Sequence, residues 1–480
     1  MRSIESIRTE RGLLVAGCLF VAVLSAGLLV RPAPTGTSQL TLPARSGEAE
    51  AAISAELPPT SLLDESLAGA SSKEAVAGPT TTITGASAAA FPYTVHDVAN
   101  TQQWLAATNS AQPGDVIRLV ATINQPLSYR GSRFQPEKQT GTDGTADRPI
   151  TITAAPGIWI DPGNQTNRVP ALDIAHTSHI QVIGVRVRNS QFGIRVQHSV
   201  GSPESPILLS NNEVTDIGHA GIHVTGHLST HEPSRYIRVI GNTVTKTGRA
   251  APEFGEGIYL GYGSQEWVDN TSGVEILNNE ISFTTAEGID VKPGTRNVLV
   301  EGNMVHDLSP IRGGAISAHY VGGRINPAIG TNSNLVIRRN RIWNVNLDGT
   351  SGSNDWAIWV GHGGVTIENN VIWGLRNDPN RTRAVRIRGL LDFGPHPIRI
   401  IDNVFWTATG WVAEGSPSAA SQVQASGNQG SAGASGVEIS LSPHPVVPAL
   451  GAGGTADSGV GPGSGFGFAP DVDLTWVHPE

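Results

Sequence analysis

The chain has 480 residues, enough for one large domain or for two or three ordinary ones, so length alone does not decide the architecture. Charged residues make up only 15%, and the 57 glycines and frequent Asn-rich turns favour many short strands joined by tight turns over long amphipathic helices. The formal net charge of -9 argues against a nucleic-acid-binding protein, because such proteins present a dense basic surface to phosphates.

The N-terminal segment, residues 1–30, has the pattern of an export signal. Arginines precede an apolar run at residues 13–30, which is the order found in a signal peptide and in a membrane anchor. The small residues of VLSAG favour cleavage after Ala26, whereas Cys18 in LVAGC resembles the cysteine of a lipoprotein box. We therefore expect a secreted or cell-surface protein, with membrane attachment through residues 13–30 as the alternative. Because Cys18 is the only cysteine, the exported part has neither disulfides nor thiolate metal sites.

Two low-complexity regions flank the predicted domain. Residues 31–90 are rich in Ala, Ser, Thr and Pro without sustained periodicity, so we expect a disordered linker. Residues 416–480 have a similar composition and form a tail that either stays free or docks on the end of the domain. The domain itself is assigned to residues 91–415, and we expect a monomer.

The domain begins with the one amphipathic helix that the pattern predicts, VANTQQWLAATNSA at residues 98–111. The segments PGDVIRLV and RPITITAA follow it as strands. A helix at this position would cover the exposed end of a repeat fold, which otherwise presents an unpaired strand edge.

The rest of the domain repeats one pattern. The segments ILLSNNEV, IRVIGNTV, VEILNNEI, VLVEGNMV, LVIRRNRI, VTIENNVI and IRIIDNVF share Asn, any residue, then an apolar residue. Second short strands such as GIHV, GIYL and GIDV follow after variable loops. Two short alternating strands per repeat predict one coil of a parallel β-helix. The shared asparagines should then stack as an interior ladder: Asn212, Asn242, Asn279, Asn303, Asn340, Asn370 and Asn403.

This order of helix, PGDVI, PITI and Asn-containing coils resembles the pectin-lyase-like superfamily over residues 92–415. The resemblance implies an all-β fold, a right-handed parallel β-helix or solenoid with an N-terminal capping helix. By itself it implies no particular reaction.

Stacking of the coils predicts which side chains become neighbours. In GIDV, Ile289 and Val291 face inward, so Asp290 and Lys292 face outward. One outward column contains Arg195, His223, Tyr259, Asp290, Ser317, Trp359 and Arg386. The next column contains Gln197, Thr225, Gly261, Lys292, His319, Gly361 and Arg388.

Glu256 and Glu287 precede the second strand in successive coils, so they should lie about 4.8 Å apart. Two carboxylates this close repel each other unless a proton, a base or a metal ion lies between them. Because the exported chain offers oxygen ligands, Ca²⁺ is the expected ion, with Asp290, Glu253 or a carbonyl completing its shell. The alternative is that the glutamates turn into solvent or pair with Lys292 and nearby arginines.

Lys292 and His319 lie one coil apart in the same column, beside the two glutamates. Removal of the C5 proton of a uronic acid requires a base, a cation that stabilises the enolate, and an acid for the leaving oxygen. A lysine acts as this base when a neighbouring cation lowers its pKa. The alternative role for Lys292 is a surface salt bridge.

The segment EGIDVKPGTRNVLVEGNMV, followed by RGGAISAHY, resembles polysaccharide lyase family six, the family of chondroitinase B and alginate lyase. The resemblance implies calcium-assisted β-elimination, with Lys292 as the base and Glu287 as a calcium ligand. Glu256 matches a calcium ligand by its column only. The family's arginine falls at His319, a departure that leaves the proton donor open, although histidine can titrate and donate.

Other outward residues are candidates for binding sugars. Tyr259 and Trp359 could stack on sugar rings, and Arg386 and Arg388 could bind sugar carboxylates. The alternative is that they are ordinary exterior aromatics and solvated strand charges.

We therefore predict an exported enzyme that cleaves an acidic, uronate-containing polysaccharide by calcium-assisted β-elimination. Lys292, His319 and Asp290 are the catalytic candidates, and Glu256 and Glu287 are the metal ligands. A glycoside hydrolase or epimerase that uses Glu256, Glu287 and Asp290 is the first alternative. A non-catalytic protein that binds carbohydrate or builds a surface structure is the second.

Overall fold

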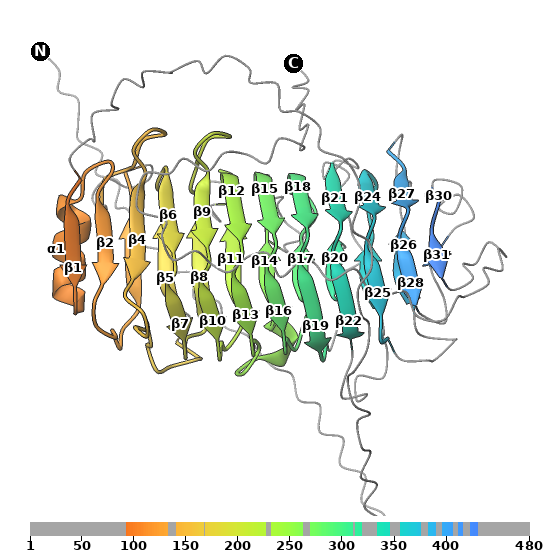
Figure 1. The fold of residues 1–480 in the computed structure, drawn as a ribbon, viewed down its shortest axis with the longest axis horizontal. Coiled ribbons are helices and arrows are strands. Elements are labelled where there is room, and N and C mark those ends of the chain that lie inside the picture. The colour runs from red at the N-terminus through yellow and green to blue at the C-terminus, as the bar shows by residue number, and fades with distance from the viewer. Residues whose placement is uncertain are drawn as a thin grey trace, which may run out of the picture. The chain divides into compact units, whose positions relative to one another are not determined.

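The computed structural model describes residues 93–132, 141–167, 169–226, 232–262, 269–310, 313–318, 334–345, 356–375, 383–389, 396–406, 411–415 and 423–430. Strands dominate these ranges, and each strand pairs in parallel with strands of the neighbouring coils (Figure 1). The expected parallel β-helix is therefore confirmed. The predicted export segment, residues 1–30, and linker, residues 31–90, lie outside the described residues, as does most of the predicted tail.

The described strands form three parallel sheets, which we call sheets A, B and C. Sheet A contains β1 (Val95–Val98), β2 (Val116–Leu119), β4 (Ile150–Ala154), β6 (Ile180–Ile183), β9 (Ile207–Ser210), β12 (Arg235–Ile240), β15 (Ser272–Leu277), β18 (Arg296–Glu301), β21 (Leu335–Arg338), β24 (Val365–Glu368), β27 (Ile398–Ile401) and β30 (Val423–Ser426). Sheet B contains β7 (Arg186–Arg188), β10 (Glu213–Thr215), β13 (Thr243–Thr245), β16 (Glu280–Ser282), β19 (Met304–Leu308), β22 (Arg341–Val345), β25 (Val371–Trp373), β28 (Val404–Trp406) and β31 (Gln429–Gly430). Sheet C contains β3 (Leu127–Arg130), β5 (Pro170–Ala175), β8 (Phe192–Gln197), β11 (Ile222–Thr225), β14 (Ile258–Leu260), β17 (Ile289–Val291), β20 (Ile316–Ala318), β23 (Trp356–Val360), β26 (Arg383–Gly389) and β29 (Trp411–Gly415).

Each complete coil therefore has three strands, where the sequence pattern predicted two. Segments such as ILLSNNEV split into a strand of sheet A and a strand of sheet B, here β9 and β10. The split falls where the residue before each ladder asparagine adopts a left-handed conformation, with φ of 53° at Asn211 and 65° at Gly241. Glycine, asparagine and aspartate tolerate this conformation best, which explains the repeated pairs NN, GN and DN.

The predicted asparagine ladder is confirmed and runs along the inside of this turn. Asn303, for example, donates its side-chain amide to the Ile276 carbonyl at 2.8 Å and to Asn340 Oδ1 at 2.9 Å. Its own Oδ1 accepts from the backbone and side-chain amides of Asn279. The ladder continues one step past the predicted set, because Asn403 donates to Asn428 Oδ1 at 2.9 Å. Each rung thereby satisfies buried polar groups of the turn.

The core fills the space between the three sheets. On sheet A, the central inward residues are fully buried and are register partners from coil to coil: Val182, Leu209, Val239, Ile276, Val300, Ile337, Ile367 and Ile400. Stacking of equivalent Val, Leu and Ile residues at each level excludes water along the length of the solenoid.

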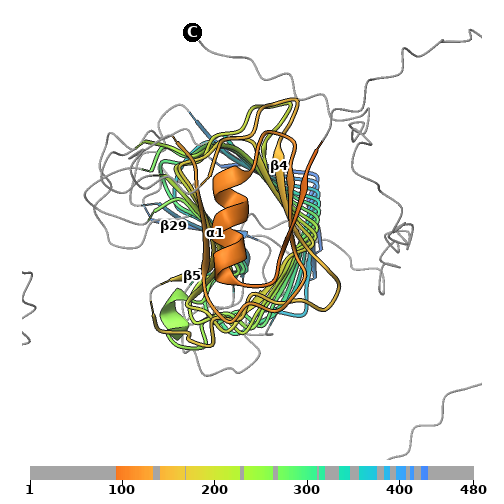
Figure 2. The same ribbon diagram turned by 90° about the vertical axis from the view of Figure 1, so that its left-hand side faces the viewer.

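The predicted capping helix is present as α1 (Thr101–Ser110), which lies across the open end of the first coil (Figure 2). It starts later than predicted because the Asn100 side chain caps it by accepting from the Gln103 amide, and because Val98 belongs to β1. Trp104 is 2% exposed and donates its indole N–H to the Ser128 carbonyl at 3.0 Å. The helix therefore closes the core at this end.

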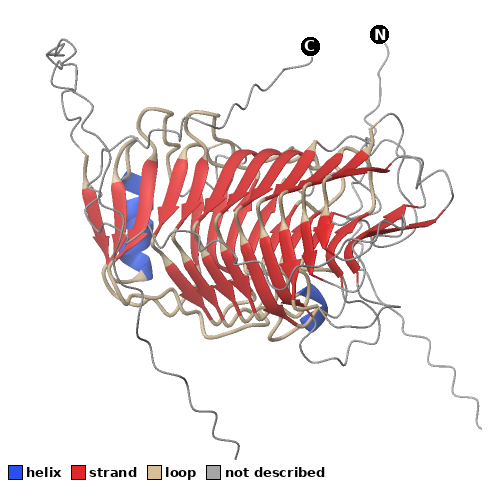
Figure 3. Cartoon of the chain, turned by 45° about the vertical axis from the view of Figure 1, so that its right-hand side comes forward, coloured by secondary structure: helices blue, strands red, loops and turns tan. Residues whose placement is uncertain are grey.

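The described strands extend beyond residue 415, which the sequence pattern predicted as the end of the domain. Both β30 and β31 continue the stack, which reaches Gly430. A short 3-10 helix, η2 (Pro252–Phe254), lies in a turn at the side of the coils (Figure 3). None of the described helices is long and apolar enough to cross a membrane.

Candidate functional site

The outer face of sheet C carries the column that the sequence predicted. The residues Arg195, His223, Tyr259, Asp290, Ser317, Trp359 and Arg386 are successive register partners on β8, β11, β14, β17, β20, β23 and β26. Their inward neighbours, among them Ile258 and Ile289, are fully buried in the core. Because the strands stack in register, residues at equivalent positions of successive coils lie next to each other, as their spacing in the sequence predicted.

Three carboxylates meet at this column, and one of them belongs to Asp290 of the column itself. Glu256, Glu287 and Asp290 each place a carboxylate oxygen within 4.8 Å of the other two. Their side chains are buried, with exposed fractions of 5%, 4% and 0% respectively. The Gly257 amide donates to the Glu287 carbonyl at 2.9 Å, which stacks the two glutamate turns directly.

Glycines position these glutamates. A Cβ on Gly257 would lie 2.4 Å from Ile281 Cγ2, and a Cβ on Gly288 would lie 2.4 Å from Val305 Cγ1. Only glycine permits this close approach of the chain to sheet B just before β14 and β17 begin. The GI pair that opens these strands in the sequence therefore also places the preceding glutamate at the edge of sheet C.

Lys292 is the cation of the site. Its ammonium forms an ion pair with Asp290 Oδ2 and lies 5.0 Å from the centre of the Tyr259 ring. Burial alone would lower the pKa of Lys292, but the charge of Asp290 and of the groups around it outweighs burial and raises that pKa above its ordinary value. The lysine is therefore held as an ammonium in this arrangement, whereas a catalytic base has to give up its proton.

The pKa values of the three carboxyl groups are raised above those of ordinary acids. Burial, assisted by the charge of Asp290 and opposed by Lys292, raises the pKa of Glu256 to about 7. The same causes raise the pKa of Glu287 well above its ordinary value. Burial also raises the pKa of Asp290, against the attraction of Lys292. A group of this kind is stable only when protons or a cation offset its negative charge.

The donor set fits a calcium ion. Within the described part of the chain, Glu256, Glu287 and Asp290 are the group of acidic or imidazole side chains placed close enough to share a metal ion. Asp290 Oδ1 is buried and accepts no hydrogen bond from the described residues. An unsatisfied carboxylate oxygen in an all-oxygen cluster is the environment that calcium prefers.

Three further residues were predicted to belong to the site: His319, Arg388 and Arg386. His319 lies outside the described residues. Arg388 belongs to β26, where its backbone pairs with Glu414, and its side chain is not described. Arg386 is 8% exposed, with its guanidinium 3.5 Å from the centre of the Trp356 ring and 5.6 Å from that of Trp359. Its planar face is therefore already covered by protein, and a role of Arg386 in ligand binding stays a prediction.

Gly313 is a site residue that the repeat pattern did not predict. Its φ is +86°, and a Cβ at this position would lie 2.1 Å from Glu287 Oε1. The glycine therefore leaves the space that the Glu287 carboxylate occupies. The sequence signal was the glycine pair Gly313–Gly314, in which Gly314 occupies the register position that Glu256 and Glu287 hold in the two preceding coils.

Comparison with known proteins supports the fold. A family model described as right handed beta helix region matches residues 170–327. Together with the three stacked parallel sheets, this match confirms the right-handed parallel β-helix, the fold of the pectin-lyase-like superfamily. A search of curated proteins finds no match.

Several solved structures are similar to this chain. The alginate lyase from Paenibacillus sp. str. FPU-7 is 18% identical with a TM-score of 0.49, over 70% of this chain and 99% of the other. The GH136 lacto-N-biosidase from Eubacterium ramulus is 14% identical with a TM-score of 0.45, over 71% of this chain and 67% of the other. PfbA, a surface adhesin of Streptococcus pneumoniae, is 12% identical with a TM-score of 0.41, over 69% of this chain and 86% of the other. Similarity at this level concerns the fold and not the reaction.

Proposed function

We propose that the protein is an exported enzyme that cleaves an acidic, uronate-containing polysaccharide by calcium-assisted β-elimination. The observation that supports this function is the placement of Lys292 against three buried carboxylates at the edge of sheet C. A lysine beside an all-oxygen cation site combines a base with a means of stabilising negative charge, which are two of the requirements of β-elimination.

In this reaction Lys292 Nζ would take the proton from C5 of the uronate residue. The C4–C5 double bond would form as the bond between C4 and the leaving oxygen breaks, and that oxygen would take up a proton. His319 is the proposed proton donor. Calcium held by Glu256, Glu287 and Asp290 would supply stabilisation of the charge that develops on the uronate carboxylate.

The same carboxylates determine whether Lys292 can act as a base. Asp290 keeps Lys292 protonated while the negative charge of the cluster is not offset. Neutralising the cluster would weaken this attraction and lower the pKa of Lys292. The proposed base is therefore competent only when the acidic cluster has been neutralised.

A screen of full-length protein against pectate, alginate and glycosaminoglycans tests the function. We expect an ultraviolet absorbance from the C4–C5 double bond of the products, dependent on calcium and abolished by a chelator. New reducing ends without this absorbance would show that the protein hydrolyses the polymer and does not cleave it by elimination. Absence of turnover on every polymer would remove the enzyme proposal in favour of a non-catalytic protein.

Hydrolysis is the second candidate, and one observation favours it. The pKa of Glu256 is raised to about 7, so this carboxyl is partly protonated at neutral pH, as a general acid must be. Its oxygens approach those of Glu287 within 4.8 Å, which is nearer to the carboxyl separation of about 5–5.5 Å in retaining glycosidases than to the wider one of inverting enzymes.

The export and the monomeric state also remain proposals. The support for export is the apolar run at residues 13–30 behind several arginines. Fractionation of cells that make the full chain, followed by determination of the N-terminus of the released protein, would test secretion against membrane attachment.

A further inference from the structure

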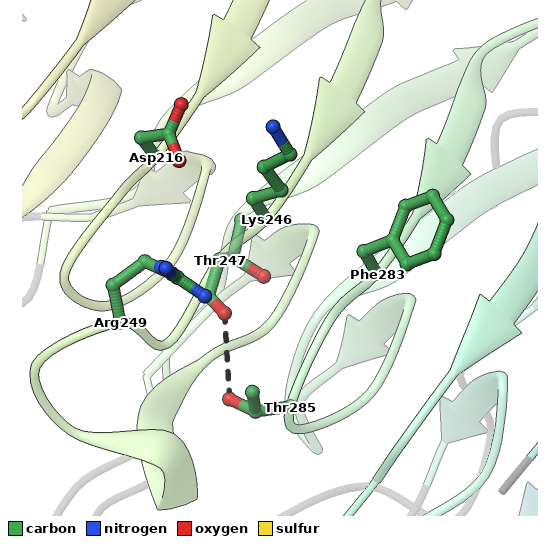
Figure 4. A pocket seen from close by; sticks show the side chains of 6 residues that line it. All are labelled: Asp216, Lys246, Thr247, Arg249, Phe283 and Thr285. Atoms are coloured by element: carbon green, nitrogen blue, oxygen red, sulfur yellow. Dashed lines mark hydrogen bonds between the residues drawn. The ribbon is translucent and has the colours of Figure 1, made fainter. Parts of the chain in front are cut away.

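A pocket separate from the acidic cluster lies at the turn between sheets B and C. Its volume is about 300 Å³, and it is lined by Asp216, Lys246, Thr247, Arg249, Phe283 and Thr285. Figure 4 shows Asp216, Lys246 and Phe283 side by side on successive turns, with Arg249 and Thr285 across from them. None of these residues belongs to the proposed catalytic group.

Two residues that line this pocket have a backbone conformation that is unusual for their residue types. At the end of the sheet B strands from β7 to β25, one register position adopts a left-handed conformation, and it is occupied in successive coils by Asn189, Asp216, Lys246, Phe283, Asp307, Asn344 and Gly374. Asparagine, aspartate and glycine tolerate this conformation, but lysine and phenylalanine adopt it at a cost of about 1–2 kcal/mol each. Lys246, with φ of 55°, and Phe283, with φ of 53°, are adjacent in the column and both line the pocket. Such strain is typical of functional positions.

The two cations of the pocket, Lys246 and Arg249, lack ion-pair partners among the described residues. Arginines on the neighbouring strands have partners: Arg186 pairs with Glu213, and Arg195 pairs with Asp173. Lys246 and Arg249 are exposed, and neither forms an ion pair with any residue that the structure describes. Two cations that line one pocket and have no ion-pair partner in the described part of the chain provide a site for an anionic group.

An apolar surface adjoins these cations. Phe283 is 52% exposed, although a phenylalanine ring is usually buried. The Thr285 hydroxyl donates to the Pro252 carbonyl at 2.8 Å, which ties the pocket to η2, where Phe254 is also 52% exposed. Exposed aromatic rings beside cations are suited to a ligand that has both an apolar face and a negative charge.

We propose that this pocket binds a uronate residue of an acidic polysaccharide, with the sugar ring against Phe283 and its carboxylate on Lys246 and Arg249. The identity of the ligand rests on the proposed function, whereas the pocket itself rests on the strain, charge and exposure of its own residues. Asp216 and Thr247 would accept or donate hydrogen bonds to sugar hydroxyls. The pocket is therefore a polymer-binding subsite in the turns that lead from sheet B to the glutamates.

The proposal is tested by replacing Lys246 and Phe283 with asparagine, which occupies the same turn position in other coils. Lys246→Asn and Phe283→Asn relieve backbone strain, so we expect thermal stability equal to or above that of the original protein. Binding of the galacturonate hexasaccharide and the mannuronate hexasaccharide is measured by calorimetry, with cellohexaose as the neutral probe. We expect at least one acidic probe to bind more tightly than cellohexaose. Each variant should weaken that binding by about threefold to tenfold, the range of one exposed ion pair or one aromatic contact.

Arg296→Gln is the matched control, because it removes an exposed positive charge from β18 of sheet A, the strand that follows β17 in the chain. It should leave the affinity unchanged. The proposal is overturned if neither acidic probe binds, if cellohexaose binds equally well, or if Lys246→Asn and Phe283→Asn bind like the original protein. It is also overturned if Arg296→Gln weakens binding as much as they do.

The outcomes separate this inference from the proposed reaction. Binding of an acidic probe that depends on Lys246 and Phe283, without any elimination product, would retain the subsite and remove the lyase. Elimination with unchanged affinity in Lys246→Asn and Phe283→Asn would retain the lyase and remove the subsite.

Discussion

Lys292 forms an ion pair with Asp290, the residue two positions before it, and Asp290 is fully buried. In an isolated strand, side chains two positions apart share one face but seldom bury a carboxylate completely. Here Glu256 and Glu287 come from the turns that precede β14 and β17 and add their charge to the same place. One lysine does not neutralise three carboxylates, so the site requires protons or a further cation.

Calcium should stabilise the protein through this cluster. Since a ligand that binds only the folded state stabilises it by about 2.7 kcal/mol at one hundred times its Kd, the melting temperature should rise as calcium is added. Asp290→Asn should abolish the rise, because it removes a buried carboxylate of the cluster. Glu213→Gln removes a carboxylate that pairs with Arg186 on sheet B and should leave the rise intact. A rise that persists in Asp290→Asn would place calcium elsewhere.

Lys292→Met should lower the rate of elimination by about 10²–10⁴-fold, the usual contribution of a general base. Lys292→Arg should be as inactive, because a guanidinium does not lose its proton in proteins. Arginine nevertheless keeps the positive charge next to Asp290, so the melting temperature of this variant should stay closer to that of the original protein. Initial rates from product absorbance measure the effect, and activity retained in either variant would exclude Lys292 as the base.

The stability of the metal-free protein should depend on pH through Glu256. Its pKa is about 7 in the folded protein, against 4.5 for an ordinary glutamate. Between these two values the folded chain keeps a proton that the unfolded chain has lost. The contribution of Glu256 is therefore fully present below about pH 4.5 and is lost as the pH rises through 7.

Urea unfolding at several pH values, in the presence of a chelator, measures this effect. The free energy of unfolding should fall less steeply over this range in Glu256→Gln than in the original protein. Glu204→Gln changes an exposed glutamate and should show the original slope. Equal slopes in Glu256→Gln and the original protein would contradict the buried, proton-holding state of Glu256.

Gly313→Ala should disturb the cluster by displacing Glu287. Gly157 provides the matched control, because its φ is +80°, close to the +86° of Gly313, but a Cβ there meets nothing within 4 Å. Both substitutions carry the left-handed backbone penalty of about 1–2 kcal/mol. Only Gly313→Ala should in addition reduce the rise in melting temperature with calcium. Equal calcium responses in the two variants would show that Glu287 has room to move without loss of the site.

Asn303→Ala should destabilise the solenoid by about 2–4 kcal/mol, because it leaves the Ile276 carbonyl and the Asn279 amides of the buried turn without their partner. Asn109→Ala, at an exposed position of α1, should change stability little. Chemical denaturation of both variants measures the difference. Similar stabilities would mean that the ladder satisfies polar groups without holding the coils together.

The repeat pattern predicted most of the fold because a β-helix is built from contacts between equivalent positions. Alternating apolar residues identified the inward face, and the asparagines identified the turn. The pattern predicted two strands per coil instead of three because Asn211 and Gly241, whose left-handed backbone separates two strands, lie within segments that look continuous in sequence. The pairs NN and GN contained that information, since those residue types favour a turn at this point.

The site was predicted in part for the same reason. Parallel stacking without a shift made Tyr259 and Asp290 neighbours and brought Glu256 next to Glu287, as their spacing implied. The pocket of Lys246 and Phe283 was missed, because its signal is a departure from the residue types of one turn position and becomes visible only after that position is known.

By itself, the sequence determined the coil, the register and the set of side chains on each face, because these depend on local spacing that repeats. Only the tertiary structure decided that Asp290 is fully buried, that Asp290 holds Lys292 as an ammonium, and that Gly313 leaves room for Glu287. These properties arise from groups in different coils that approach each other and exclude water. The pKa values in the site depend on that exclusion together with the charges of Asp290 and Lys292, which the fold brings into contact.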